Sequence, residues 1–206
     1  MRRFELSIKH ALDFTVGILF IVALSPLFLL IALLIKLDSR GPVFFKQERV
    51  GKNGRLFTLY KFRSMINHAE NLGPGLALWQ NDSRITSVGN FLRKYSLDEL
   101  PQIVNIIKGE MSFIGPRPTL LYQVKQYNDF QQKRLLMRPG ISGWAQVNGR
   151  NTLSWQQRIA LDVWYVEHYS IVLDVKIFFK TFPVIFNRKG IYGKEGINQD
   201  FKSPQK

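Results

Sequence analysis

The feature that most constrains the fold of this chain is an apolar segment near its N-terminus, residues 14–35, which contains no Asp, Glu, Lys or Arg. A straight helix over about twenty apolar residues is long enough to span a bilayer. The run is too long for the core of a secretory signal, and no small-residue cleavage site follows it. One interpretation of the segment is therefore a single transmembrane anchor.

Two observations favour a helix that enters the bilayer, breaks and returns. Ser25-Pro26 stands near the middle of the run, where proline removes a backbone hydrogen bond and kinks a helix. The Ser25 hydroxyl is a local partner for a carbonyl freed at that break. Basic residues on both flanks would hold both ends at the cytoplasmic face. They are Arg2, Arg3, Lys9, Lys36, Arg40, Lys46 and Arg49. Proline kinks also occur in spanning helices, so both topologies stay open on these residues.

Composition restricts the class of protein and of partner. With 46% hydrophobic and 21% charged residues among 206, the chain is expected to fold around a core. Its formal net charge of +14 implies an anionic partner, which is nucleic acid, anionic lipid or a phosphorylated substrate. The lack of cysteine excludes disulfides and thiolate metal sites. Three isolated histidines, His10, His68 and His168, argue against a zinc site.

The pattern after the apolar segment predicts a mixed α+β domain. Residues 41–59 favour a β-hairpin, because Gly51-Lys52-Asn53-Gly54 is a strong turn signal between apolar stretches. A polar loop is expected over 67–83, which contains Gly-Pro-Gly at 73–75. An amphipathic helix that ends near Gly109 is predicted by apolar residues on one helical face. These residues are Leu97, Leu100, Ile103, Val104 and Ile107.

Two more helices are expected toward the C-terminus, over 155–168 and over 170–186. The second is apolar but carries Asp174, Lys176 and Lys180, and it contains the helix-disturbing Pro183. Its composition is typical of a helix lying in a membrane interface, with a buried core helix as the alternative.

Adjacent carboxylates at Asp98 and Glu99 permit two interpretations. In the structural one, Ser96 is the N-cap of a helix and Glu99 reaches back to its amide as a capping box. Pro101 would then stand one position deeper than proline prefers.

In the functional interpretation, two acids stand side by side within reach of basic residues in a chain that has 29 bases and 15 acids. A carboxylate at a helix N-terminus among cations stays ionised and can act as nucleophile or metal ligand. Arg117 lies between two prolines, whose stiff backbone would place its guanidinium accurately against phosphate oxygens. A merely solvated arginine is the alternative.

Two other clusters carry binding groups. Residues 138–151 contain three glycines and a proline, and they offer Trp144 for stacking and Gln146, Asn148 and Arg150 for hydrogen bonds to a nucleotide. An ordinary structural loop has the same composition. Residues 60–65 alternate bases with apolar residues and place Lys61 and Arg63 near phosphates on charge grounds, although an edge strand with a solvated basic face fits equally.

Six motifs in order resemble the bacterial sugar transferase family, the monotopic phosphoglycosyl transferases. They are YKFRSM at 60–65, NDSRIT at 81–86, LDELPQ at 97–102, GEMS at 109–112, GPRP at 115–118, and RPGISGWAQVNGRN at 138–151. A single motif is weakly specific, whereas six in register are strongly specific. The resemblance runs from the apolar segment to about residue 186, and Ser25-Pro26 matches the re-entrant helix break of the family.

The resemblance implies a UDP-sugar donor, undecaprenyl phosphate as acceptor, Mg²⁺ and a covalent intermediate. Asp98 matches the nucleophilic aspartate and Glu99 its dyad partner, and both are expected at the metal. Arg93 and Arg117 match phosphate-binding positions, and Arg150 matches a position near the donor nucleotide. We expect sugar-1-phosphate transfer with release of UMP, at the start of surface-glycan assembly.

The expected fold is a monotopic α+β membrane protein of three regions. They are a re-entrant helix over 1–40, a cytoplasmic, helix-rich catalytic domain with a small hairpin over 41–190, and a polar tail over 191–206. It would lie at the cytoplasmic face of the bacterial inner membrane. The expected partners include membrane lipid and exclude nucleic acid, and a homodimer is compatible with the sequence. The alternatives are a glycosyl transferase that releases UDP, and a non-enzymatic basic protein that binds the membrane surface.

Overall fold

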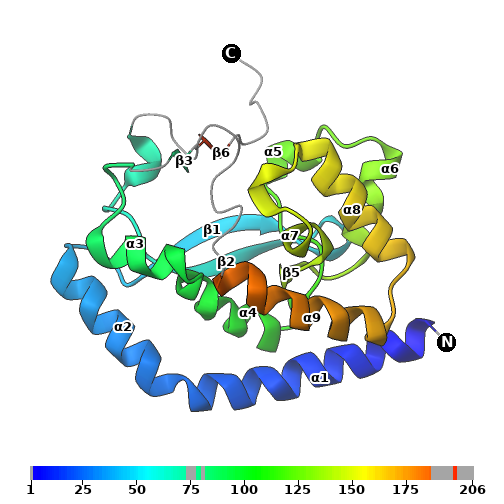
Figure 1. The fold of residues 1–206 in the computed structure, drawn as a ribbon, viewed down its shortest axis with the longest axis horizontal. Coiled ribbons are helices and arrows are strands. Elements are labelled where there is room, and N and C mark those ends of the chain that lie inside the picture. The colour runs from blue at the N-terminus through cyan, green and yellow to red at the C-terminus, as the bar shows by residue number, and fades with distance from the viewer. Residues whose placement is uncertain (1, 73–77, 80–81, 187–196, 199–206) are drawn as a thin grey trace.

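The computed structural model describes residues 2–72, 78–79, 82–186 and 197–198. It confirms a mixed, helix-rich α+β architecture with small two-stranded sheets (Figure 1). The Gly-Pro-Gly sequence at 73–75 and most of the predicted tail at 191–206 lie outside the described residues.

The N-terminal segment forms two helices, α1 (Arg2–Ala23) and α2 (Ser25–Asp38), which meet at Leu24. Pro26 lies in the first turn of α2, where its missing N–H costs little because helix-start amides lack intrahelical partners. The Ser25 hydroxyl donates to the Val22 carbonyl at 2.8 Å, so a carbonyl near the break is satisfied. The predicted helix–break–helix and the local role of Ser25 are therefore confirmed.

Helix α1 lies along the rest of the protein (Figure 1). A Cβ at Gly17 would be 3.1 Å from the Ile107 side chain, so the backbone of α1 closely approaches the helix that carries Ile107. Lys9 donates from α1 to Asp174 at 2.6 Å. Within the described residues, only Phe4–Ala23 is long and apolar enough to cross a membrane by length and composition.

The predicted hairpin is confirmed. Strands β1 (Phe44–Val50) and β2 (Leu56–Phe62) pair antiparallel with Phe44 opposite Phe62. The connecting turn contains η1 (Lys52–Gly54), in which Asn53 and Gly54 have φ of 55° and 77°. Asparagine and glycine are the residues that tolerate this conformation best, which explains the turn signal.

Two other strand pairs are short. Strand β4 (Ser112–Ile114) runs parallel to β5 (Gly140–Ser142), and β3 (Leu78–Trp79) pairs antiparallel with β6 (Ile197–Asn198). A Cβ at Gly140 would be 2.1 Å from the Gly115 amide nitrogen. Glycine at position 140 thus lets the segments that carry GPRP and RPG approach each other directly.

The helix expected to end near Gly109 is divided, which corrects the prediction. It consists of a 3₁₀ segment η3 (Leu97–Gln102), which accommodates Pro101, and a short helix α4 (Ile103–Ile107). The other helical elements are η2 (Ala69–Asn71), α3 (Ser87–Lys94), α5 (Leu121–Val124), α6 (Asp129–Gln132), η4 (Lys133–Leu136), α7 (Trp144–Val147), η5 (Arg150–Thr152), α8 (Trp155–Glu167) and α9 (Ile171–Phe186).

Both predicted C-terminal helices are present as α8 and α9. Leu173 and Ile177 of α9 are buried in the largest apolar cluster, together with Tyr165 of α8. Phe179 on α9 remains 66% exposed, so this helix is buried on one side only and is not a core helix. A second cluster joins Ile35 of α2 to the hairpin and α3.

We predict that Gly89→Ala destabilises the protein. A Cβ at Gly89 would be 1.9 Å from the Ser64 carbonyl oxygen, so α3 would have to move away from the end of β2. Overpacking of this kind costs about 1–3 kcal/mol, which exceeds the helix-propensity gain of about 1 kcal/mol. Thermal unfolding in detergent should show a lower Tm. Asn90→Ala, at an exposed neighbouring position on α3, should leave Tm nearly unchanged.

Candidate active site

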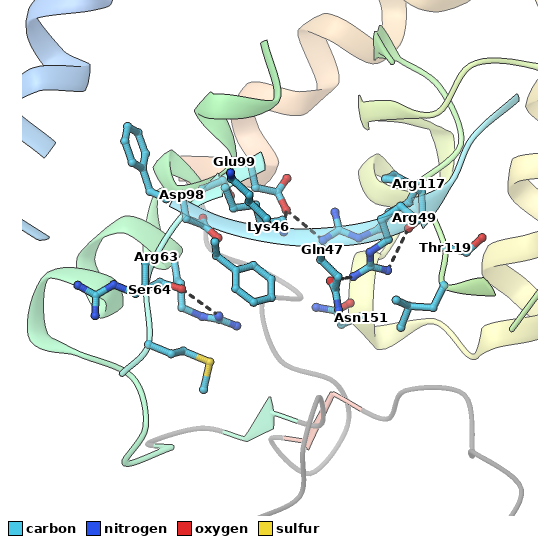
Figure 2. Close-up of a pocket in the computed structure, with 18 of the residues that line it drawn as sticks. Lys46, Gln47, Arg49, Arg63, Ser64, Asp98, Glu99, Arg117, Thr119 and Asn151 are labelled. Carbon is cyan, nitrogen blue, oxygen red and sulfur yellow. Dashed lines mark hydrogen bonds and ion pairs between the residues drawn. The ribbon is translucent and has the colours of Figure 1, made fainter. Parts of the chain in front are cut away.

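A cavity of about 640 Å³ lies among the hairpin, the α3–η3 connection and the segments that follow β4 and β5 (Figure 2). Most of the residues predicted from sequence to form the site line it. They are Lys61, Arg63, Arg93, Asp98, Glu99, Arg117, Gln146 and Arg150. Residues that are far apart in the chain, from β2 to η5, therefore meet at one place.

The Asp98-Glu99 pair is presented by η3. Ser96, just before it, has a left-handed backbone with φ of 57° and makes no side-chain capping bond. The capping-box interpretation is therefore wrong. Glu99 instead accepts through Oε1 from Lys61 Nζ at 2.8 Å and from Arg117 Nη2 at 3.0 Å.

This double ion pair sets the charge state of Glu99. Burial alone would raise the pKa of Glu99, but Lys61 and Arg117 outweigh burial and lower it well below its usual range. The ionised Glu99 carboxylate in turn neutralises part of the positive charge of Lys61 and Arg117 at the cavity.

Asp98 has different surroundings. Its side chain lines the cavity but is only 8% exposed, and within the part of the chain that the structure describes, its carboxylate makes no hydrogen bond or ion pair. Burial raises the pKa of Asp98, and the charge of Glu99 adds to that effect, against the opposing influence of Lys61, Arg93 and Arg117. The direction differs from the sequence expectation that cations would dominate at this carboxylate.

The other predicted cations of the cavity are weakly held. Arg93, near the end of α3, donates to the Ser64 hydroxyl at 3.4 Å. Arg150 donates to the Ser96 hydroxyl at the same length, and burial lowers its pKa. Both contacts are long for hydrogen bonds, so these guanidinium groups can turn to an anionic ligand.

Arg63 has a different role from the predicted one. Its three guanidinium nitrogens donate to the carbonyls of Pro42, Arg40 and Ser39 at 2.6, 2.8 and 2.8 Å. These bonds fix the connection between α2 and the hairpin. The structure therefore does not support Arg63 as a phosphate-binding residue, and the edge-strand interpretation of a solvated basic face fails as well, because Arg63 is buried.

The two predicted amide side chains differ in position. Asn148 is exposed, is absent from the cavity lining, and donates to the Trp144 carbonyl at 2.7 Å. The structure does not support it as a nucleotide-binding residue. Gln146 does line the cavity, and neither polar atom of its side chain has a hydrogen-bond partner among the described residues.

The sequence analysis missed a buried support beneath this site. Arg134, between α6 and β5, forms an ion pair with Asp162 of α8 and donates to the Tyr127 hydroxyl and the Arg117 carbonyl. Burial raises the pKa of Asp162, and Arg134 opposes that effect. The pair thereby anchors the backbone of the segment that carries Arg117. The sequence signal for this support was Asp162, an acid on the apolar face of the helix predicted over 155–168.

The donor set fits a magnesium ion only in part. Asp98 is free of protein bonds, and the second oxygen of Glu99, Oε2, makes none within the described ranges. No group of three or more His, Cys, Asp or Glu that could hold a metal occurs among those residues. Mg²⁺ is commonly bound through one or two carboxylates and substrate phosphates, so these two side chains fit that kind of site.

We predict that Asp162→Asn destabilises the protein by about 3–5 kcal/mol, because Arg134 is left as a buried charge without its carboxylate. Chemical unfolding in detergent measures the loss. Glu167→Gln is the matched control on the same helix. It removes the exposed ion pair with Lys133, the neighbour of Arg134, and should cost no more than about 1 kcal/mol. Equal losses in the two variants would contradict the assignment.

Comparisons with known proteins identify relatives over most of the chain. The profile described as bacterial sugar transferase matches residues 4–188. The chain is 41% identical over 184 residues to the uncharacterized sugar transferase EpsL of Bacillus subtilis, covering 89% of this chain and 90% of that protein.

Longer relatives match over the same region. The chain is 45% identical to the UDP-N-acetylgalactosamine-undecaprenyl-phosphate N-acetylgalactosaminephosphotransferase of Aeromonas hydrophila and 41% identical to the UDP-glucose:undecaprenyl-phosphate glucose-1-phosphate transferase of Escherichia coli. The matches cover 89% and 90% of this chain but only 44% and 41% of those proteins. With the six motifs and a profile match over nearly its whole length, the chain belongs to the bacterial sugar transferase family.

Proposed function

We propose that this protein is a phosphoglycosyl transferase that moves a sugar-1-phosphate from a UDP-sugar to undecaprenyl phosphate and releases UMP. Relatives named as undecaprenyl-phosphate phosphotransferases support the general reaction. The observation that carries the finer proposal is Asp98, a carboxylate without a protein partner among the described residues, in a cavity lined by cations.

The first step is attack on the donor. An Asp98 carboxylate oxygen forms a bond to the β-phosphorus of the UDP-sugar, and the bond from that phosphorus to the bridging oxygen breaks. UMP leaves with the bridging oxygen, and the sugar phosphate remains on Asp98. Two anions must approach each other in this step, so neutralisation by Arg93, Arg117 and Arg150 is its main physical requirement.

The second step regenerates the carboxylate. An oxygen of the lipid phosphate attacks the same phosphorus, and the bond to Asp98 breaks, which gives a polyprenyl diphosphate sugar. One phosphoanhydride is lost and one is formed, so the overall reaction needs no further energy source.

Glu99 serves as a positioning residue in this proposal. It holds Lys61 and Arg117 together through Oε1, and it lines the cavity beside Asp98. Asp98 and Glu99 would hold Mg²⁺ together with the donor diphosphate, and a bound ion would supply charge neutralisation there.

We further propose a monotopic membrane arrangement at the cytoplasmic face of the inner membrane, with 1–40 as the re-entrant region and 41–190 as the catalytic domain. Support comes from the break at Leu24 and from α1, which packs on α4 and is joined to α9 by the Lys9–Asp174 ion pair instead of standing clear of the protein (Figure 1). Helix α2 has only 14 residues and reaches about 21 Å, which is short of a bilayer core of about 30 Å.

Asp98→Asn should abolish covalent chemistry. Wild-type protein in detergent, given a UDP-sugar and Mg²⁺ but no lipid, should release UMP in an amount close to that of the enzyme and gain the mass of a phosphosugar. The asparagine variant has no anionic nucleophile, so it should show neither change. An adduct on this variant, seen by intact mass spectrometry, would show that another residue attacks.

Two controls sharpen this experiment. Glu99→Gln keeps the nucleophile but weakens the hold on Lys61 and Arg117, so the adduct should still form, slower by on the order of 10²-fold. EDTA should suppress the burst if the proposed magnesium site exists. Release of UDP instead of UMP would favour the glycosyl transferase alternative, and release of neither would favour the non-enzymatic one.

The topology can be tested with single cysteines, because the natural chain has none. We predict that cysteines at Ser7 and Arg40, on either side of the break, both react with an impermeant maleimide only after cell lysis. Lys125→Cys, on the exposed surface of the catalytic domain, is the cytoplasmic control. Labelling of either flanking position in intact cells, with the control protected, would establish a spanning helix.

A further inference from the structure

Helix α9 presents an apolar stripe to the outside of the protein. At 100° per residue, its exposed apolar side chains lie within an arc of about 120°. They are Val172, Val175, Phe178, Phe179, Phe182 and Phe186. Leu173 and Ile177 on the opposite side are buried, so the helix has a clear inner and outer face.

Two lysines follow one edge of this stripe. Lys176 and Lys180 are one helical turn apart and exposed, and their ammonium nitrogens lie 5.8 and 5.0 Å from the ring centroid of Trp144. Trp144 in turn stacks on Trp164 at 5.2 Å with an interplanar angle of 25°. The indole therefore holds both cations beside each other at the border between apolar and polar surface.

Nothing among the described residues of α9 neutralises these lysines. The only acid of the helix, Asp174, faces the other way and bonds to Lys9 at 2.6 Å and to the Tyr165 hydroxyl at 2.6 Å. The lysine pair is thus a local positive charge next to apolar side chains.

Helix α9 lies beside α1, and the Lys9–Asp174 ion pair joins the two helices (Figure 1). Exposed apolar residues of α1 include Phe14, Leu19 and Val22. A surface with an apolar face and flanking lysine and tryptophan side chains is typical of a helix seated at the headgroup level of a membrane.

We propose that Lys176, Lys180 and Trp144 form a binding site for the phosphate headgroup of an anionic phospholipid, with the stripe of α9 among the acyl chains. None of the three lines the catalytic cavity, so this site is separate from the proposed donor site. The proposal rests on the membrane location proposed above and not on the reaction itself. Positive charge and an apolar neighbour together select an anionic lipid over a free phosphate.

The test uses the full chain reconstituted in vesicles. Two lipids, phosphatidylglycerol and phosphatidylcholine, each carry a nitroxide at carbon 5 of one acyl chain and quench the tryptophan fluorescence. The ratio of the affinities of the protein for the two lipids, measured by this quenching, gives the preference for the anionic headgroup. Lysine near an anionic membrane surface contributes about a fivefold preference, so Lys176→Gln and Lys180→Gln should each reduce the ratio about fivefold.

Lys125→Gln, which removes one exposed charge on α5's C-cap, is the matched control and should keep the wild-type ratio. All variants retain the four tryptophans. An unchanged ratio in both α9 variants or an equal loss in the control would overturn the proposal. So would a loss of quenching when free inorganic phosphate is added as a competitor. The lipid-free UMP burst should be unchanged in the α9 variants, so failure of this site is distinguishable from failure of the proposed reaction.

Discussion

The candidate site depends on one carboxylate that binds two cations. Glu99 joins Lys61 of β2 to Arg117 of the segment after β4, and these residues come from three separate parts of the chain. Without the Glu99 carboxylate, the positive charges of Lys61 and Arg117 would repel each other across the cavity. Because the same contacts lower the pKa of Glu99, they favour the ionised carboxylate on which both ion pairs depend.

A second ion pair, between Arg134 and Asp162, stabilises the segment that carries Arg117. Arg134 and Asp162 are both almost fully buried, and Arg134 also bonds to the Arg117 carbonyl at 3.0 Å. The backbone of Arg117 is thus fixed by α8 and the α6–β5 connection, while its side chain is 46% exposed and bonded to Glu99 at the cavity. Preorganisation of this kind lets a guanidinium meet an anion without a large loss of conformational freedom.

Sequence reasoning succeeded where the cause is local. The break at Ser25-Pro26 follows from the missing proline amide, and the hairpin follows from Asn53-Gly54 at positive φ. It failed where the cause is tertiary. The charge and position of Arg63 in its motif suggested a phosphate ligand, but the carbonyls that it binds belong to the connection between α2 and the hairpin, whose position no local pattern reveals.

The same limit applies to the carboxylates. The sequence shows Asp98 and Glu99 side by side but does not show which of them pairs with the cations, because the pairing depends on which side chain faces Lys61. The structure assigns the nearest cations to Glu99 and leaves Asp98 buried with a raised pKa. The geometry shows Arg63 bonded to backbone carbonyls and Asn148 outside the cavity lining, and it adds Arg134 and Asp162 as a buried support.

The unequal division of charge has a consequence for the proposed chemistry. Nine Lys and Arg side chains line the cavity against three carboxylates, which leaves a formal excess of six positive charges when the three acids are ionised. A diphosphate diester carries one negative charge on each phosphate and would offset part of that excess. Burial that disfavours the charge of Asp98 also leaves its carboxylate poorly solvated, and a poorly solvated anion is the better nucleophile. The binding energy of the donor phosphates on Arg93, Arg117 and Arg150 is then available to bring two anions together, which is the largest barrier in the proposed first step.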